Sequence, residues 1–417
     1  MVGSGIFRTP GVVAAQLGRP GLTFVAWTLG GALGLLGALV FAELSTRHPE
    51  AGGKYVYARE AFGPRAGFVV GWSEALGMYC AAVAALAVVS GEYLARLLGW
   101  SAASPRALGA GFVALFVAVN LGGVSVGRWA QNLATSAKVL GLAGVVVAAA
   151  FAGDGAGWRT SLPGAPAAGG MLGAMALAFQ AVIWTYYGYP DAAKIAEEMV
   201  EPGRTLPRVY LMGIGLVTLL YVLLNAAFLY VLPMDRIAGS QLVAGDVMAA
   251  LFGARAGALM AGLALLVVMA SVNANIFVTP RVLFGLARDG MAPAALARVS
   301  ARGTPWTATL LVGVVAIALA ATGTFERLLS LAIMLVLLTD GFMVLVLFRL
   351  RRRRPAAPFR VPLYPFLPSL FLGIYALLFV VSARAQPLLA GVTVALLGLT
   401  YLAGAMAARP DGARTRS

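Results

Sequence analysis

The chain opens with the stretch VGSGIF, residues 2–7, in which two glycines flank a serine at the start of an apolar segment. Glycine has no Cβ, so it tolerates unusual backbone conformations and lets a ligand approach the backbone N–H and C=O groups. Within a membrane, free backbone groups are tolerated only where they line a cavity enclosed by protein or filled with water. We therefore expect this stretch to lie at a binding site inside the membrane and to begin a helix that runs to about Leu17.

The composition is that of a protein that crosses the membrane many times. Of the 417 residues, 60% are hydrophobic and 11% are charged, whereas an ordinary soluble domain carries about 25% charged residues. We expect an all-α integral membrane protein with one transmembrane domain, residues 1–407, and a short tail, residues 408–417. Since a span needs about 20 apolar residues, we predict eleven spans after the opening segment: Leu22–Ser45, Ala66–Leu98, Leu108–Gly123, Ala134–Ala152, Met171–Glu197, Leu206–Leu232, Ala256–Leu286, Trp306–Ala321, Leu328–Phe348, Leu367–Val381 and Leu388–Ala407.

A second break interrupts the span Met171–Glu197, where residues 184–191 read WTYYGYPD. Pro190 removes a backbone donor and Gly188 tolerates unusual dihedral angles. Paired interruptions five spans apart indicate an inverted repeat of five plus five helices with a central site, a pattern typical of secondary transporters. We therefore predict two broken helices that meet at this site, and two further helices at the C-terminal end. A proline kink without a function is the alternative for the second break alone.

The charges are distributed as in an inner-membrane protein. The formal net charge is +15, but Arg and Lys gather in alternate loops, such as the run Arg351–Arg354, while the opposite loops hold mostly single arginines such as Arg327. By the positive-inside rule the first set of loops and the C-terminus lie in the cytoplasm. This distribution favours the lipid bilayer as the partner of the basic residues and argues against nucleic acid.

Several motifs follow one another in a distinctive order. They are GSGIF at residues 3–7, AEL at 42–44 with PEAGGKY at 49–55, AEE at 196–198 with EP at 201–202 and LPR at 206–208, SVN at 271–273 with PR at 280–281 and ARDG at 287–290, and FRVP at 359–362. In this order they resemble the amino acid–polyamine–organocation superfamily of transporters, in its L-type and bacterial amino acid permease branches. The resemblance covers essentially the whole chain. It also implies a half-helix ahead of the glycine stretch, so we expect the first half-helix to be absent from this sequence and the inner side of the site to be less well closed.

The resemblance implies an amino acid substrate, whose two opposite charges must both be matched in a cavity of low polarity. A helix N-terminus suits a carboxylate, so we assign the carboxylate to the amides around Gly3, Ser4, Gly5 and Ile6. The amino group would take carbonyls of the half-helix that ends near Val182, Ile183, Trp184 and Thr185. For Ser4, a hydroxyl bonded to its own helix is the alternative.

Two aromatic residues of the second break shape the expected site. Trp184 matches the position of an aromatic gate in related exchangers and would cover the substrate; a core tryptophan is the alternative. Tyr187 stands where relatives often carry smaller residues, so its ring would narrow the pocket and favour small or medium neutral side chains.

Lys138 is the expected coupling residue. A lysine inside the span Ala134–Ala152 costs several kcal/mol unless it is solvated, paired or deprotonated. In proton-coupled bacterial relatives, a lysine of this helix takes the place of a sodium ion, which implies that Lys138 carries the coupling proton. A lysine that reaches back to the cytoplasmic interface is the alternative. We also expect Ser271 and Asn273 to join the eighth helix to the first, with helix packing as the alternative, and we rank Glu74, Glu92 and Asp340 below Lys138 as proton carriers.

These observations predict a secondary active transporter of amino acids in the cell inner membrane, working by alternating access on neutral L-amino acids with proton coupling. A sodium-independent exchanger, an amine or polyamine permease and a transporter-like nutrient sensor are the alternatives.

The single histidine, His48, lies in a loop and no catalytic motif is present, so we expect no enzyme, no cofactor and no metal site. The outer loop Gly99–Ala107 has no cysteine, so we expect no covalently attached heavy subunit. A homo-oligomer is left as an alternative to a single chain. Cys80 is the only cysteine, and we expect it to be buried in the core.

Overall fold

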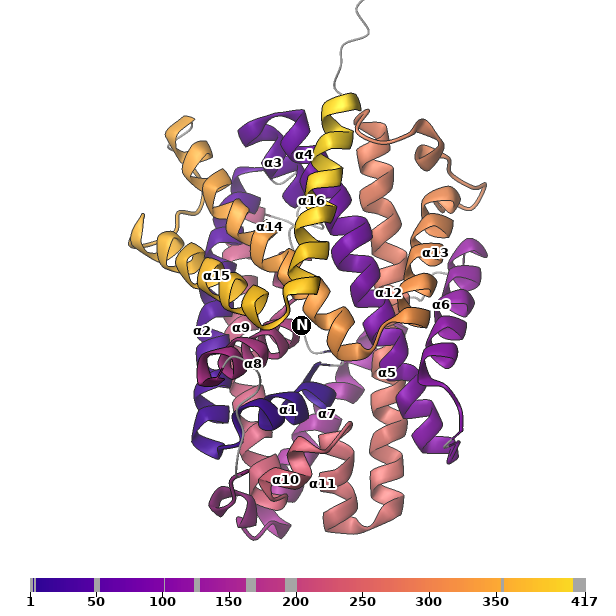
Figure 1. Ribbon diagram of the computed structural model, residues 1–417, viewed down its shortest axis with the longest axis vertical. Coiled ribbons are helices and arrows are strands. Elements are labelled where there is room, and N and C mark those ends of the chain that lie inside the picture. Colours follow the sequence, from indigo (N-terminus) through magenta and orange to yellow (C-terminus); the bar gives the residue numbers. More distant parts are fainter. Residues whose placement is uncertain are drawn as a thin grey trace, which may run out of the picture.

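The computed structural model describes residue 3 and residues 5–48, 53–100, 102–123, 128–162, 170–191, 201–353 and 356–407. Within these residues the regular structure is helical, without strands, and most helices run along the long axis of the molecule (Figure 1). Eight apolar stretches of the described chain are long enough to cross a membrane, and four shorter apolar helices accompany them. The prediction of an all-α membrane protein is confirmed.

The helices follow the predicted spans closely. The first is α1 (Gly5–Leu17), which is followed by Gly18 in the left-handed conformation (φ 63°). The others that correspond to spans are α2 (Pro20–Arg47), α4 (Pro64–Trp72) with η1 (Ser73–Tyr79) and α5 (Cys80–Leu98), α6 (Pro105–Leu121), α7 (Arg128–Ala152), α8 (Gly170–Tyr186), α9 (Pro202–Val231), α12 (Ala254–Arg288), α13 (Trp306–Thr322), α14 (Phe325–Arg353), α15 (Phe366–Ala385) and α16 (Pro387–Ala407).

Helix α8 stops at the predicted break. It ends at Tyr186, and Gly188 then adopts φ 116°, a conformation that a residue with a side chain rarely takes. A short turn follows at residues 189–191. The predicted span continued to Glu197, but residues 192–200 lie outside the described part of the chain. Because the helix ends at Tyr186, backbone polar groups of the residues that follow can face the interior of the protein.

Helices α1 and α8 pack against each other near the middle of the molecule, and α2 packs against α9. In the view of Figure 1, α1 lies between the two ends of the bundle and next to α8. The start of α1 is therefore placed at the level of the break in α8.

Three elements differ from our sequence-based expectations. The segment after α2, expected to be a loop, contains α3 (Lys54–Phe62), because glycines occupy only its ends (Gly53 and Gly63) and leave nine residues free to form a helix. The stretch 234–253, between the predicted spans Leu206–Leu232 and Ala256–Leu286, holds α10 (Met234–Ala238) and α11 (Val243–Phe252). The second span is not a uniform α-helix, because η1 is a π-helix.

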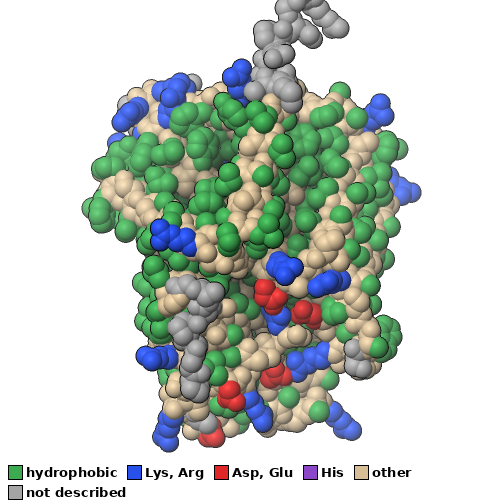
Figure 2. All heavy atoms as spheres, viewed as in Figure 1, with side chains coloured by type: hydrophobic (Ala, Val, Ile, Leu, Met, Phe, Trp, Pro, Cys, Tyr) green, Lys and Arg blue, Asp and Glu red, His purple; other side chains and the backbone are tan. Residues whose placement is uncertain are grey.

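The surface has the character expected of a protein surrounded by lipid. On the face shown in Figure 2, hydrophobic side chains cover most of the upper part, and the visible Asp and Glu side chains lie in the lower half. Large apolar side chains such as Phe151, Leu259 and Leu388 are between 78% and 89% exposed. Cys80 is fully buried, as predicted.

Candidate functional site

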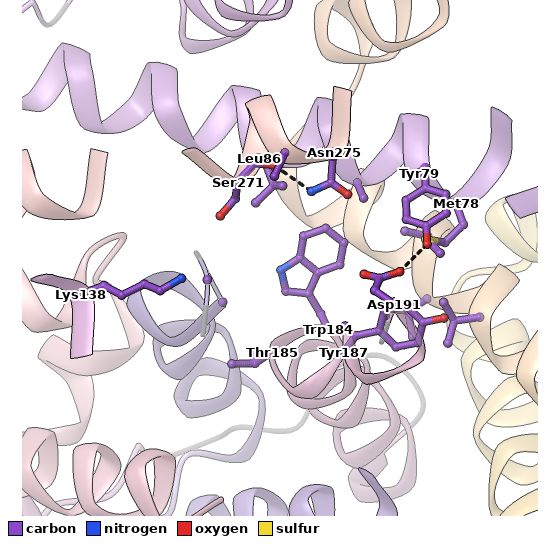
Figure 3. A pocket seen from close by; sticks show the side chains of 18 residues that line it. Met78, Tyr79, Leu86, Lys138, Trp184, Thr185, Tyr187, Asp191, Ser271 and Asn275 are labelled. Carbon is purple, nitrogen blue, oxygen red and sulfur yellow. Dashed lines mark hydrogen bonds between the residues drawn. The ribbon is translucent and has the colours of Figure 1, made fainter. Parts of the chain in front are cut away.

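A cavity of about 220 Å³ lies between the start of α1 and the end of α8. Its remaining walls come from η1 and α5 on one side and from α7, α12 and α14 on the others. Figure 3 shows Lys138 on one side of this space, Trp184 in the middle, and Asp191 with Tyr79 on the other side. The cavity therefore lies where the two predicted breaks meet.

The start of α1 forms one end of the cavity. Gly3 and Gly5 line it, whereas Ile6 is fully buried and does not; Ser4 lies outside the described residues. Since α1 begins at Gly5, the amides of its first turn have no partner within the helix, and the helix dipole adds partial positive charge there. This end of the cavity can hold an anionic group.

The two breaks are in direct contact through Gly5 and Thr185. A Cβ on Gly5 would lie 2.7 Å from Thr185 Oγ1 and 2.8 Å from Thr185 Cα, so a side chain at this position would clash with α8. The hydroxyls of Thr9 and Thr185 are 2.6 Å apart, and Thr9 Oγ1 donates to the carbonyl of Gly5 at 2.8 Å. Threonine hydroxyls therefore fix the start of α1 against the end of α8.

The end of α8 contributes Trp184, Thr185 and Tyr187 to the cavity wall. The side chains of Val182 and Ile183 are buried and lie outside the lining. The carbonyl of Ile183 accepts from Tyr187 N at 2.8 Å, and that of Thr185 accepts from Tyr221 Oη at 3.2 Å. Each carbonyl oxygen keeps a second lone pair, so these groups can still accept a hydrogen bond from a ligand.

Lys138 and Ser271 also line the cavity, whereas Asn273 does not. The half-buried Lys138 extends from α7 toward the start of α1 (Figure 3). Within the described residues it has no ion-pair partner. Asn273 accepts from Asn120 Nδ2 at 2.8 Å and thereby joins α12 to α6, while Ser271 Oγ donates to the carbonyl of Val267 at 2.9 Å within α12.

Two polar residues that the sequence analysis did not select stand at the far end of the cavity. Tyr79 and Asp191 both line it, and Tyr79 Oη donates to Asp191 Oδ1 at 2.7 Å. Asp191 closes the quoted stretch WTYYGYPD, so a charged residue next to a helix break was a signal that could have identified it. Tyr79 gave no such signal, because its orientation depends on the π-helix.

Behind Tyr187 lies a buried cluster of charges. Lys54 Nζ donates to Tyr187 Oη at 2.6 Å and lies 2.7 Å from Asp340 Oδ1 and 3.4 Å from Glu74 Oε1. Lys54, Glu74 and Asp340 are all at most 3% exposed. Burial alone would lower the pKa of Lys54, but the neighbouring carboxylates Asp340 and Glu74 outweigh burial and raise this pKa above its ordinary value. Lys54 is therefore held as a cation directly behind the cavity wall.

The third carboxyl group that the sequence analysis ranked below Lys138 lies elsewhere. Glu92 of α5 is 3.6 Å from Arg8 Nε of α1, and Arg8 Nη2 donates to Glu326 of α14 at 2.7 Å. Glu74 and Asp340 thus share one cluster with Lys54, and Glu92 belongs to another.

Apolar helices long enough to cross a membrane surround a polar cavity at which the start of α1 meets the end of α8, an arrangement typical of membrane transport proteins. The chain belongs to the amino acid permease family, whose sequence model matches residues 1–402.

Individual relatives agree with this assignment. The chain is 29% identical over 378 residues to the serine/threonine exchanger SteT of Bacillus subtilis (strain 168), covering 89% of this chain and 85% of the exchanger. It is 31% identical over 408 residues to Asc-type amino acid transporter 1 of Homo sapiens, covering 95% and 77%. It is 29% identical over 402 residues to b(0,+)-type amino acid transporter 1 of Mus musculus, covering 93% and 80%.

Proposed function

We propose that the protein carries amino acids across the cytoplasmic membrane by alternating access, with the cavity between α1 and α8 as its substrate site. The observation that carries this proposal is the contact of Gly5 with Thr185, which places a helix N-terminus and the end of a second helix at one point of a cavity. The family assignment supports the same activity.

The substrate's carboxylate binds the backbone amides at the start of α1, around Gly3, Ser4, Gly5 and Ile6. Its amino group binds carbonyls at the end of α8, between Val182 and Thr185. An amino acid carries its two charged groups on one carbon, and the contact between Gly5 and Thr185 brings both kinds of partner within reach of that carbon. Neither group would then be buried without compensation.

The preferred substrates are neutral L-amino acids. Tyr187 narrows the cavity, and its hydroxyl is engaged by Lys54, which fixes the ring in place. The names of the relatives point in the same direction, since SteT is a serine/threonine exchanger.

Transport is coupled to a proton carried by Lys138. Its ammonium extends toward the start of α1 and has no carboxylate partner within the described residues, so its charge is free to respond to the substrate's carboxylate. Exchange without a proton is the second candidate, favoured by the similarity to the exchanger SteT.

We further propose a five-plus-five inverted repeat followed by two helices, with residues 1–407 as one transmembrane domain and the C-terminus in the cytoplasm of an inner-membrane protein. The pairing of α1 with α8 and of α2 with α9 supports this arrangement, because these are the corresponding helices of the two halves.

The test is counterflow in proteoliposomes loaded with an unlabelled amino acid, with uptake of labelled serine, threonine, alanine, valine and leucine measured against protein-free liposomes. Counterflow detects symport, exchange and uniport alike. The proposal is supported if any of these labelled amino acids is taken up and if the same unlabelled amino acid, added outside, inhibits that uptake. Monodisperse protein that transports none of these amino acids contradicts the proposal. Where transport is seen, an imposed pH gradient separates proton symport from exchange.

A further inference from the structure

A second cavity, also of about 220 Å³, lies apart from the cavity between α1 and α8 and shares none of its described lining residues. It is bounded by the end of α6, the second half of α12 and the loop that leads into α13. These three helices pack against one another on one flank of the bundle, and the loop between α12 and α13 lies at the upper end in Figure 1. Two arginines line the cavity, Arg281 of α12 and Arg302 of the loop.

Arg302 is held against the end of α6. Its Nη1 donates to the carbonyl of Gly122 at 2.5 Å, and its aliphatic part packs so closely over Gly123 that a Cβ there would lie 2.7 Å from Arg302 Cδ. Thr304 donates from its hydroxyl to the carbonyl of Asn120 at 3.2 Å and ties the loop to the same helix end. The guanidinium of Arg302 is therefore positioned at the wall of the cavity.

The guanidinium of Arg281 is positioned by Phe277, one turn earlier in α12. Its Cζ lies 3.5 Å from the centroid of the Phe277 ring, and its Nη1 donates to the Phe277 carbonyl. A guanidinium has five N–H donors. Within the described residues, one donor of the Arg281 guanidinium and one of the Arg302 guanidinium are bonded, so the others can serve a ligand in the cavity.

The segments that form this cavity contain no acidic residue. Neither Asp nor Glu occurs from residue 93 to 153, from 247 to 288 or from 290 to 325, and the first stretch includes residues 124–127, which follow Gly123 and lie outside the described part of the chain. Asp289, between the other two stretches, is paired with Arg59. Within the described residues neither Arg281 nor Arg302 forms an ion pair. Two guanidiniums in one cavity favour an anion, and their planar forks match a phosphate group.

The neighbouring face of α13 indicates where this phosphate comes from. Trp306 follows Pro305 of the cavity wall and is exposed, and tryptophans are enriched at the level of the lipid headgroups. The exposed Leu310 and Val314 follow at intervals of four residues and so lie on the same face of the helix. Basic pockets between membrane-spanning helices recognise the headgroups of anionic lipids.

We propose that Arg281 and Arg302 form a binding site for a phosphate group, supplied by the headgroup of an anionic phospholipid. The phosphate accepts hydrogen bonds from both guanidiniums, while the acyl chains lie along Trp306, Leu310 and Val314. The lipid thereby joins α12 to the loop before α13. This site is independent of the proposed transport activity, since it needs neither the first cavity nor a transported substrate.

The experiment adds phosphatidylglycerol, or phosphatidylcholine with the same acyl chains, to the full chain in detergent. Native mass spectrometry counts the bound lipids, and the rise in unfolding temperature with lipid concentration gives an apparent affinity. We expect phosphatidylglycerol to bind at least tenfold more tightly than phosphatidylcholine. Since a hydrogen bond to a charged group corresponds to a factor of about ten or more, the double variant Arg281→Gln/Arg302→Gln should lose at least tenfold in affinity for phosphatidylglycerol.

The matched control is Arg288→Gln/Arg298→Gln. It removes the same charge from two exposed arginines at the same end of the molecule that do not line the cavity, and it should keep the preference for phosphatidylglycerol. If the first double variant does not fold, Arg302→Lys replaces it: the charge stays but the fork is lost, so the affinity should fall several-fold.

Three results would overturn the proposal. The unmodified protein could bind both lipids equally, or the two double variants could lose affinity to the same extent, which would reduce the effect to net charge. In a further arm, inorganic phosphate at the same concentration should neither raise the unfolding temperature nor displace phosphatidylglycerol. If it does both, the ligand is a soluble phosphate and not a lipid.

Discussion

The ring of Trp184 meets the ring of Phe325 edge-on, with 6.3 Å between the ring centroids and 83° between the ring planes. The guanidinium carbon of Arg8 lies 5.5 Å from the centroid of the same Phe325 ring. Arg8 is held in turn by Glu326. Trp184 is thus the cavity-facing member of a stack that joins α8, α14 and α1. Its role as a cover over the substrate is a proposal, which the following substitution tests.

Replacing Trp184 with alanine should weaken substrate retention. The lost aromatic pair and substrate contact together are worth up to about 1.5 kcal/mol beyond area burial, so we expect the half-saturation concentration in counterflow to rise by about tenfold. Trp100→Ala, at a tryptophan that is 51% exposed, is the control and should behave like the unmodified protein. Unchanged half-saturation in Trp184→Ala would rule out its role as a cover.

Gly5→Ala should abolish transport. The new Cβ would meet the backbone of Thr185 at 2.8 Å, and backbone cannot move aside as a flexible side chain can. The start of α1 would be pushed away from α8, so the sites for the two charges of the substrate would separate. Counterflow measures the loss. Gly21→Ala, whose Cβ would meet nothing within 4 Å, should keep full activity; full activity in Gly5→Ala as well would show that the contact is not needed.

Lys138→Met should remove coupling but retain binding. The variant keeps most of the length of the side chain without its charge, so proton-driven accumulation should fall to the level at which inside and outside concentrations are equal. Counterflow, which needs no driving force, should continue at a reduced rate. The test measures accumulation of substrate under an imposed pH gradient. If Lys138→Met accumulates as much substrate as the unmodified protein does, Lys138 is excluded as the proton carrier.

The buried pair of Lys54 and Asp340 should show strong coupling in a double-mutant cycle. Lys54→Met alone leaves the buried carboxylates of Asp340 and Glu74 without their cation and should cost about 3–5 kcal/mol of stability. Asp340→Asn alone should cost less, because Lys54 keeps Glu74 as its partner. The double variant should cost clearly less than the sum, because the loss of Lys54 then leaves only Glu74, and no longer Asp340, as a buried carboxylate without its cation. Thermal unfolding in detergent measures all three, and additive losses would show that the pair does not act as a unit.

The contacts of Lys54 with Asp340 and Glu74 also predict how the stability of the folded protein depends on pH. Burial opposes the charge of Lys54, but Asp340 and Glu74 outweigh it and raise its pKa above 10.5. Since the folded pKa lies above the unfolded one, the stabilisation is complete below pH 10.5 and is lost as the pH rises through the folded value. The gap in unfolding temperature between the unmodified protein and Lys54→Met should thus stay constant from about pH 7 to 10 and narrow only above this range. Narrowing below pH 9 would contradict this assignment.

Much of the fold could be predicted because hydropathy and helix breakers act locally. Apolar length alone located the spans, and glycine with proline located the break after Tyr186. The helix α3 was missed because a nine-residue segment with charged residues does not resemble a span, although its Lys54 and Tyr57 are buried against neighbouring helices.

The site could be predicted only in part. Seven residues that were selected from motifs do line one cavity: Gly3, Gly5, Trp184, Thr185, Tyr187, Lys138 and Ser271. The partners of Lys54 could not be predicted, because Asp340 is 286 residues away along the chain and only the packing of α3 against α14 brings them together. Likewise, Glu43 of the AEL motif accepts from Val361 N of the FRVP motif at 2.7 Å, a contact that neither motif reveals alone.

The π-helix at Ser73–Tyr79 has a consequence for how such proteins diverge. Its wide turns place Glu74 and Tyr79 on nearly the same face, the first toward Lys54 and the second toward Asp191. In an α-helix of 3.6 residues per turn, positions five apart would be separated by about 140°. A lineage that deleted one codon from this segment would keep every span, every motif and nearly the same hydropathy profile. It would nevertheless turn one of the two side chains away from its partner, so a single-residue change in length would alter either the lining of the cavity or the charge cluster behind it.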